Sequence, residues 1–122
     1  IGGCASQCLI APAEHDLYPF YPDLLIFHVY GSNIDYEKII RRVRETTTAE
    51  VLLLTDHYTG TSAWSDRMSY EFIPQFATSY QCGLVDIRHA WLQYLREHSY
   101  LLSKLLADGT HLNAHGNFLM AE

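Results

Sequence analysis

Two near-continuous runs of apolar residues, at positions 24–29 and 51–55, stand out along this chain. Such runs are typical of strands that are buried on both faces of a parallel sheet, whereas half-exposed strands alternate apolar and polar residues. A shorter segment at positions 83–86 predicts a third strand. We therefore expect three parallel strands, with the first two covered on both faces.

Between and after these strands, apolar residues recur with the period of a helix. The helical patterns cover residues 35–46, 67–80, 87–98, 101–106 and 113–120. Asp35 and Asn113 are the expected N-caps of the first and last of these helices. Pro74 is expected to start or kink the second helix near Ile73, because proline has no amide hydrogen to donate.

The chain before the first strand is expected to be mostly irregular. Its first ten residues are small and apolar, which indicates the end of a loop that enters a short helix or turn, and Pro12, Pro19 and Pro22 predict a linker up to Asp23. Beyond it strands and helices alternate, which predicts an α/β fold with a parallel sheet. Right-handed crossovers would place helices on both faces, and ligands would bind at the carboxyl ends of the strands.

The length and the net charge of the chain indicate the number of domains and the kinds of partner to expect. The chain has 122 residues and is expected to form one domain over residues 1–122. Its formal net charge is -6, and its basic run at positions 41–44 has Glu37 and Glu45 as neighbours. Because phosphate binding needs a concentrated basic surface, we expect no nucleic-acid partner. No apolar stretch approaches the roughly 20 residues that span a bilayer, so we expect no membrane span.

Neither the cysteines nor the first residue identifies the cellular compartment of the protein. Cys4, Cys8 and Cys82 form neither a disulfide framework nor the paired spacing of a zinc site. Three free thiols are the expectation, and a Cys4–Cys8 disulfide is the alternative for an exported protein. The chain begins with Ile1 and shows no signal-like n-region. We therefore expect a processed product or a piece of a longer polypeptide, either cytoplasmic or secreted.

A carboxylate and an imidazole come together just before the last helix. Asp108 stands three residues before His111, a spacing that can place the carboxylate against the ring. Such a contact holds a histidine in one tautomer and stabilises the imidazolium that forms when it takes a proton. We interpret His111 as a general base that Asp108 orients; the alternatives are a surface histidine and an aspartate in an Asp-Gly turn. Because Asn113 caps the helix, His111 and His115 are not expected to be metal ligands on one helical face.

The predicted strand ends carry further polar groups. Gly31 and Asn33 follow the first strand, and their amides are donors suited to a developing oxyanion; Asn33 could instead cap the next helix. His57 follows the second strand and could line a substrate pocket, or it could be a solvated loop histidine. Since the carboxyl ends of parallel strands meet at one edge of a sheet, we expect these groups to lie at that edge.

Together these segments resemble the SGNH hydrolases, also called GDSL-type esterases and lipases. Three of the family's four sequence blocks can be placed in order, at residues 1–6, 31–33 and 108–111. The resemblance implies a flavodoxin-like, three-layer α/β/α fold with a parallel sheet. It covers the later part of the family's domain, so it implies a fold that is incomplete at the N-terminus and lacks the first strand.

The resemblance also implies roles for single residues. Gly3 and Asn33 would donate to the oxyanion, His111 would be the catalytic base, and Asp108 would orient it. Ile34 stands where the family usually has Asp or Glu, which is a departure next to Asn33. The family's first block, which carries the nucleophilic serine, has no counterpart here.

No residue of the chain occupies a recognisable nucleophile turn. The candidates are Ser6, Ser32, Ser62, Ser65 and the thiol of Cys4. We expect the serine on a segment upstream of Ile1, which in the family supplies a strand next to the one at residues 24–29. A companion segment or self-association would then complete the sheet.

The expected function is a serine ester hydrolase for acyl or acetyl esters of small molecules or carbohydrates. It would need no metal or organic cofactor, and it would be inactive until the upstream serine is supplied. The alternative is a non-catalytic α/β interaction module, or a degenerate SGNH-like protein, that binds a partner at the open sheet edge. A flavodoxin-like phosphate or cofactor binder ranks last, because no Gly-rich phosphate loop follows a predicted strand.

Overall fold

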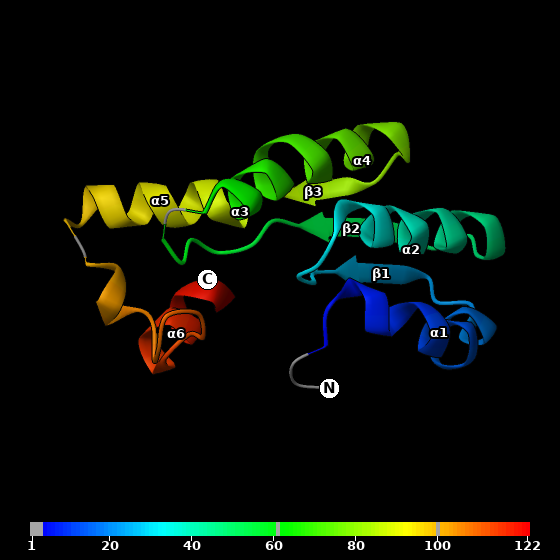
Figure 1. The fold of residues 1–122 in the computed structure, drawn as a ribbon, viewed down its shortest axis with the longest axis horizontal. Coiled ribbons are helices and arrows are strands. Elements are labelled where there is room, and N and C mark those ends of the chain that lie inside the picture. Colours follow the sequence, from blue (N-terminus) through cyan, green and yellow to red (C-terminus); the bar gives the residue numbers. More distant parts are fainter. Residues whose placement is uncertain (1–3, 61, 100) are drawn as a thin grey trace.

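The computed structural model describes residues 4–60, 62–99 and 101–122. Three parallel strands form one sheet, in the order β1 (Leu24–Phe27), β2 (Glu50–Leu54) and β3 (Gly83–Val85) (Figure 1). Leu53 lies opposite Phe27 on one side and Leu84 on the other. The three predicted strands are therefore present, each ending slightly earlier than expected.

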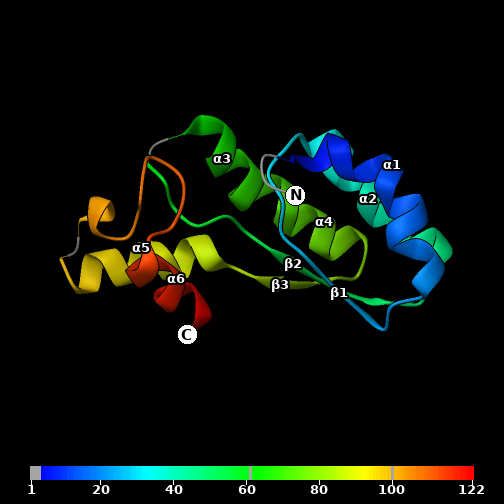
Figure 2. The same ribbon diagram turned by 90° about the horizontal axis from the view of Figure 1, so that it is seen from below.

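Helices connect and follow the strands. They are α1 (Ser6–Asp16), α2 (Asn33–Thr46), α3 (Ala63–Arg67), α4 (Ile73–Ser79), α5 (Ile87–Glu97) and α6 (Ala114–Ala121), with 3₁₀ turns at Tyr18–Phe20 and Leu102–Lys104. Helices α1, α2 and α4 lie on one side of the sheet, and α5 and α6 lie beyond the carboxyl ends of the strands (Figure 2). None of these helices, within the described residues, combines the length and the apolar character that crossing a bilayer requires.

Helix α1 begins where we predicted a loop to enter a short helix or turn, but it continues to Asp16, so the prediction of a linker from Pro12 onwards is wrong for residues 12–16. Ser6 and Ala13 are buried on this helix, and Leu9 and Ile10 pack against the core. These four positions have the spacing of one helical face. Pro12 leaves the carbonyl of Cys8 without its helical donor, and Cys8 is exposed, so water can bind that carbonyl.

Helix α2 begins at Asn33, two residues before the predicted start, because Ser32 is its N-cap. The hydroxyl of Ser32 accepts a hydrogen bond from the N–H of Asp35 at 3.1 Å and donates to the Asp35 carboxylate at 2.8 Å. The cap satisfies an amide that has no partner within the helix. Neither Asp35 nor Asn33 is therefore the cap, so the expectation for Asp35 and the alternative considered for Asn33 are both wrong.

Helix α3 continues into α4 through a π-helical turn, Met68–Phe72. Pro74 has no N–H to donate to the carbonyl one turn earlier, and the helix widens in the residues just before it. The break predicted near Ile73 is thus present as a change of helix type. The helical stretch begins at Ala63 rather than at residue 67, because Ser62 caps it.

The core lies between the sheet and the helices on one of its sides. The fully buried ring of Tyr36 has its centroid 4.5 Å from that of Phe27 and 6.0 Å from that of Phe76. On the other side of β1, Leu24 and Ile26 are 54% and 58% exposed. Alternate residues of a strand face opposite sides, so the expectation that this strand is buried on both faces is wrong.

A disulfide joins the segment before α1 to its first turn. Cys4 and Cys8 are bonded, with their Cα atoms 5.8 Å apart, and Cys82 is a half-buried free thiol. The expectation of three free thiols is therefore wrong, and the alternative pairing is the one present.

Candidate active site

The loop between Leu105 and Asn113 carries the pair of residues singled out from the sequence. Nδ1 of His111 lies 2.8 Å from Oδ2 of Asp108. Oδ1 of Asp108 accepts hydrogen bonds from the backbone N–H groups of Thr110 and His111, both at 2.7 Å. The carboxylate therefore fixes both the turn of the loop and the orientation of the imidazole.

Backbone contacts close this loop on itself. The N–H of Ala107 donates to the carbonyl of His111 at 2.8 Å, and the N–H of Asn113 donates to the carbonyl of Leu105 at 3.0 Å. The side chain of Asn113 accepts from the N–H of Gly116 at 2.9 Å, so Asn113 caps α6 as predicted. The loop is thus held at the start of a helix without help from the substrate.

The electrostatics of the pair favour an ionised carboxylate. Hydrogen bonds from the backbone N–H of His111, from its imidazole and from the N–H of Thr110 lower the pKa of Asp108 well below its ordinary value. The side chains of His111 and Asp108 are 81% and 57% exposed. When neutral, His111 donates from Nδ1 to the carboxylate, which leaves Nε2 as a free acceptor.

His111 lies on an open cleft of about 760 Å³ at the carboxyl ends of β1 and β2. Its walls include His28 and Tyr30, which follow β1, His57, which follows β2, and residues at the start of α1. Segments that are distant in the sequence therefore meet at one edge of the sheet, where ligands bind in open α/β folds.

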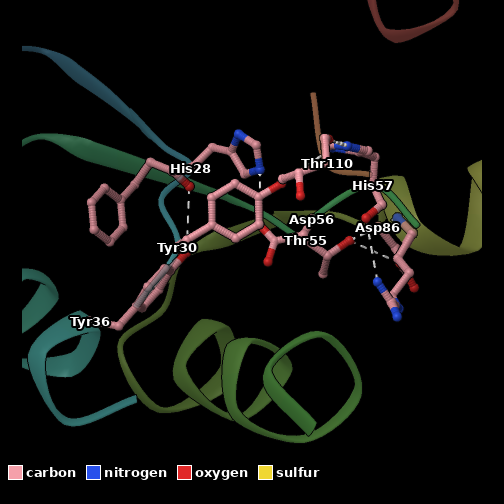
Figure 3. A network of polar contacts seen from close by, with 10 residues as sticks. His28, Tyr30, Tyr36, Thr55, Asp56, His57, Asp86 and Thr110 are labelled. Atoms are coloured by element: carbon pink, nitrogen blue, oxygen red, sulfur yellow. Dashed lines mark hydrogen bonds and ion pairs between the residues drawn. The ribbon is translucent and has the colours of Figure 1, made fainter. Parts of the chain in front are cut away.

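His57 is buried, with 6% of its surface exposed, so the alternative of a solvated loop histidine is wrong. Nε2 of His57 donates to the carbonyl of Thr110 at 2.9 Å, and its Nδ1 lies 3.5 Å from the hydroxyl of Tyr30 (Figure 3). Burial lowers the pKa of His57, which favours the neutral ring. His57 thus ties the loop that carries His111 to the end of β2.

A second histidine–carboxylate pair, which sequence reasoning missed, lies in the same region. Nε2 of His28 lies 3.0 Å from Oδ1 of Asp56 (Figure 3). The side chain of Asp56 is 8% exposed and that of His28 is 28% exposed. The signal was available, because each residue lies within two residues of the end of one of two neighbouring strands whose carboxyl ends meet.

Of the two expected oxyanion donors, the structure describes Asn33 but not Gly3. Asn33 is half-buried in the first turn of α2 and is not among the residues that line the cleft. Gly3 lies outside the described residues. The residues that follow it, Cys4 and Ala5, line the cleft.

The start of α1 is joined closely to the end of β1. The N–H of Ser6 donates to the carbonyl of Tyr30 at 2.7 Å. Gly31 has a φ of 146°, and a Cβ at this position would overlap the side chain of Ser6. The glycine therefore allows the two segments that form one wall of the cleft to touch.

Among the described residues, no serine lines the cleft. Ser6 is fully buried, and its hydroxyl has no hydrogen-bond partner within the described part of the chain. Ser32 and Ser62 accept hydrogen bonds from backbone amides as the N-caps of α2 and α3, and Ser65 lies within α3. Within the described part of the chain none of these hydroxyls lines the cleft of His111, and Cys4 offers no free thiol because it is bonded to Cys8.

The histidines near α6 do not form a metal-ligand pair on one helical face. His111 precedes α6, whereas His115 lies within it. Across residues 4–60, 62–99 and 101–122, no group of three His, Cys, Asp or Glu side chains is arranged to hold a metal ion.

The fold is shared with acetyl xylan esterases of known structure. The chain matches the crystal structure of the acetyl xylan esterase AlAXEase with a TM-score of 0.79 and 22% identity, over 99% of this chain and 74% of that chain. It matches Axe2, an acetylxylan esterase from Geobacillus stearothermophilus, with a TM-score of 0.77 and 17% identity, over 98% of this chain and 65% of that chain. A catalytic mutant of Axe2, in which a histidine is replaced by alanine, matches with a TM-score of 0.77 and 16% identity, over 98% and 65% of the two chains.

No protein-family model and no curated protein matches the chain. At these identities the matches establish the fold alone, and they confirm the expected α/β fold with a parallel sheet. The chain spans 65% to 74% of the length of these structures.

Proposed function

We propose that this chain belongs to the SGNH-type ester hydrolases and supplies the base of a serine hydrolase site. The observation that carries the proposal is the 2.8 Å contact between His111 and Asp108, with His111 on a cleft at the carboxyl ends of parallel strands. A histidine that a carboxylate orients, and whose other nitrogen is open, is what acyl transfer requires of its general base. The shared fold with acetyl xylan esterases supports the same conclusion.

In the proposed reaction, Nε2 of His111 takes the proton of a serine hydroxyl as the serine oxygen attacks the ester carbonyl. Asp108 holds the ring and stabilises the imidazolium. The bond between the acyl carbon and the alcohol oxygen then breaks, and the imidazolium gives its proton to the leaving alcohol. His111 next takes a proton from water, which attacks the acyl-serine; the acid is released and the serine regains its proton. No step requires a metal or an organic cofactor.

We assign the stabilisation of the carbonyl oxygen to the backbone amide of Gly3 and the side-chain amide of Asn33. The resemblance to the SGNH hydrolases is the basis for both assignments, and for Asn33 it is the sole basis, since Asn33 is not among the described residues that line the cleft. The position of Cys4 and Ala5 on the cleft wall supports the first of them. Loss of one such donor typically slows acyl transfer by about 10²- to 10³-fold.

We further propose that the nucleophilic serine is carried by a segment outside these 122 residues, in a companion chain or in a longer parent polypeptide. Two observations support this: no described serine lines the cleft, and among the described residues no strand pairs with the outer edge of β1. Leu24 and Ile26 on this strand are largely exposed, as expected if a further segment of the protein covers these two side chains. By this proposal the chain alone is inactive.

The proposed substrates are acyl or acetyl esters of small molecules or carbohydrates. The likeness to acetyl xylan esterases supports an acetylated carbohydrate in particular. The exposure of His111 supports it as well, since an open site can admit an ester whose alcohol part is bulky.

A second candidate function is a non-catalytic module that binds a partner along the free edge of β1. The exposed Leu24 and Ile26 favour it, because an unpaired strand with apolar side chains is a template for the addition of another strand.

A fluorophosphonate probe, which labels activated serines, tests the proposal on the 122-residue chain and on the full-length polypeptide encoded by its gene. We expect labelling of one serine in the full-length polypeptide and none in the chain alone. Hydrolysis of 4-nitrophenyl acetate should fall at least about 1,000-fold in His111→Ala. The matched control is His89→Ala, which replaces an exposed histidine on α5 outside the cleft. A folded full-length polypeptide that neither reacts with the probe nor hydrolyses the ester, alone or together with any chain that copurifies with it, would refute the hydrolase and favour the second function.

A further inference from the structure

His28 and Asp56 form an imidazole–carboxylate pair that the proposed acyl transfer does not use. Oδ1 of the nearly buried Asp56 lies 3.0 Å from Nε2 of His28. A buried carboxylate is costly to leave unpaired, so this contact holds both side chains in place. It also sets the tautomer, because Nε2 carries the hydrogen that the carboxylate accepts and Nδ1 is left as an acceptor.

This acceptor belongs to the cleft of His111. The side chain of His28 is 28% exposed and lines the cleft. Within the described part of the chain, no other group forms a hydrogen bond with its Nδ1. The cleft therefore contains a fixed, unused acceptor in addition to the proposed base.

Tyr30 adds an aromatic surface next to this acceptor. The ring centroids of His28 and Tyr30 are 5.9 Å apart. Tyr30 is 42% exposed and lines the cleft, while its hydroxyl lies 3.5 Å from Nδ1 of His57. A ring that is already anchored offers apolar contact without the entropy cost of ordering it when a ligand binds.

We propose that His28 and Tyr30 bind the alcohol part of the ester, and that this alcohol is a polyhydroxylated ring. Nδ1 of His28 accepts a hydrogen bond from a ring hydroxyl close to the ester, and Tyr30 packs against the C–H face of the ring. Asp56 is a positioning residue that acts through His28. This inference rests on the proposed function and adds to it a determinant of specificity, namely free hydroxyls beside the bond that is cleaved.

The test variant is His28→Gln. The amide N–H of glutamine can donate to Asp56 as Nε2 of His28 does, so the buried carboxylate retains its partner. Its amide oxygen does not occupy the position of Nδ1, so the acceptor at that position is lost. The full-length polypeptide is assayed on a monoacetylated methyl β-xylopyranoside and on 4-nitrophenyl acetate, whose alcohol part has no further hydroxyl. We expect the ratio of the two kcat/KM values to fall about three- to tenfold, through KM for the sugar ester. His89→Gln, outside the cleft, is the matched control and should leave the ratio unchanged.

A pair of substitutions at Tyr30 tests the aromatic surface separately. Tyr30→Phe retains the ring, whereas Tyr30→Leu removes it. Only the leucine variant should lower the ratio; an equal fall in both variants would contradict a role for the ring.

Binding of methyl β-xylopyranoside to the 122-residue chain separates this inference from the proposed function. The readout is the NMR amide signals of His28 and Tyr30 during titration. If the full-length polypeptide hydrolyses neither ester, the proposed function fails, and saturable shifts that weaken in His28→Gln still support the sugar subsite. The subsite is refuted if the wild-type chain shows no saturable shifts, if His28→Gln binds equally well, or if this variant lowers both kcat/KM values by the same factor.

Discussion

Replacing His57 should loosen the loop that carries His111 without unfolding the chain. His57→Leu removes the 2.9 Å hydrogen bond from Nε2 to the carbonyl of Thr110. Thr110 is exposed, so water can bind the carbonyl that loses its donor. For the loop, the loss is therefore limited to the net value of this one hydrogen bond, about 1 kcal/mol; the 3.5 Å contact of Nδ1 with the Tyr30 hydroxyl is also lost, but it does not involve the loop. The backbone contacts within the loop remain.

A change of this size is measurable in the loop itself. About 1 kcal/mol corresponds to about a fivefold shift in an equilibrium, so hydrogen exchange of the amides at residues 105–113 should accelerate about fivefold in His57→Leu. Ester hydrolysis by the full-length polypeptide should fall through kcat, since a displaced catalytic group slows the chemical step. His57→Gln is the matched control, because its amide can donate to the same carbonyl. Equal exchange rates in the leucine variant and the wild type would refute the role assigned to His57.

Because His57 is buried, the stability of the chain should depend on pH. Burial lowers the pKa of His57 from its ordinary 6.5, so the unfolded chain binds a proton more readily than the folded chain. The free energy of unfolding should therefore decrease as the pH falls below about 6.5 and show no contribution from His57 well above it. Urea titrations at about pH 7.5 and about pH 5.5, followed by the fluorescence of the buried Trp91, should show a smaller decrease in His57→Gln.

Three further substitutions test other parts of the fold and the site. Ser32→Ala removes the N-cap of α2 and should lower the free energy of unfolding by about 1 kcal/mol in urea titrations. Gly31→Ala should lower it by more than about 1 kcal/mol, because φ is 146° and an added Cβ would overlap Ser6; a neutral result would contradict this packing. Hydrogen bonds hold the pKa of Asp108 below its ordinary 3.8, so its support of the loop is complete above about pH 4 and is lost on acidification. Asp108→Asn should abolish the acid-induced shift of the His111 amide signal in NMR spectra.

The strands and most helices were predictable because burial leaves a period in the local sequence. The runs at residues 24–29 and 51–55 correspond to β1 and β2, and the helical face of residues 35–46 is the buried face of α2. The length of helix α1 escaped prediction because Pro12 and the small residues around it conceal the apolar spacing. The exposed face of β1 was not predicted, because a run of apolar residues does not indicate which other elements cover the strand.

The candidate site was predictable only where its residues are close in sequence. Asp108 and His111 belong to one turn, so their contact follows from local geometry. The contacts of His28 with Asp56 and of His57 with Thr110 depend on strand order and on where a distant loop returns to the sheet. Those contacts require the folded chain, and spacing along the sequence does not encode them.

The buried contacts of Arg88 determine where the chain near this site can be lengthened. It is fully buried at the start of α5, and its guanidinium binds the carbonyl of His57 and the carboxylate of Asp66. Separating Arg88 from these partners would leave its buried charge unpaired, at a cost of several kcal/mol. His57 and Asp66, the two ends of the segment at residues 58–65, therefore stay together. Lengthening a loop between fixed ends costs little, about 0.6 kcal/mol for each doubling. Residues could therefore be inserted or exchanged here, by evolution or by design, to remodel the surroundings of the site without displacing His57.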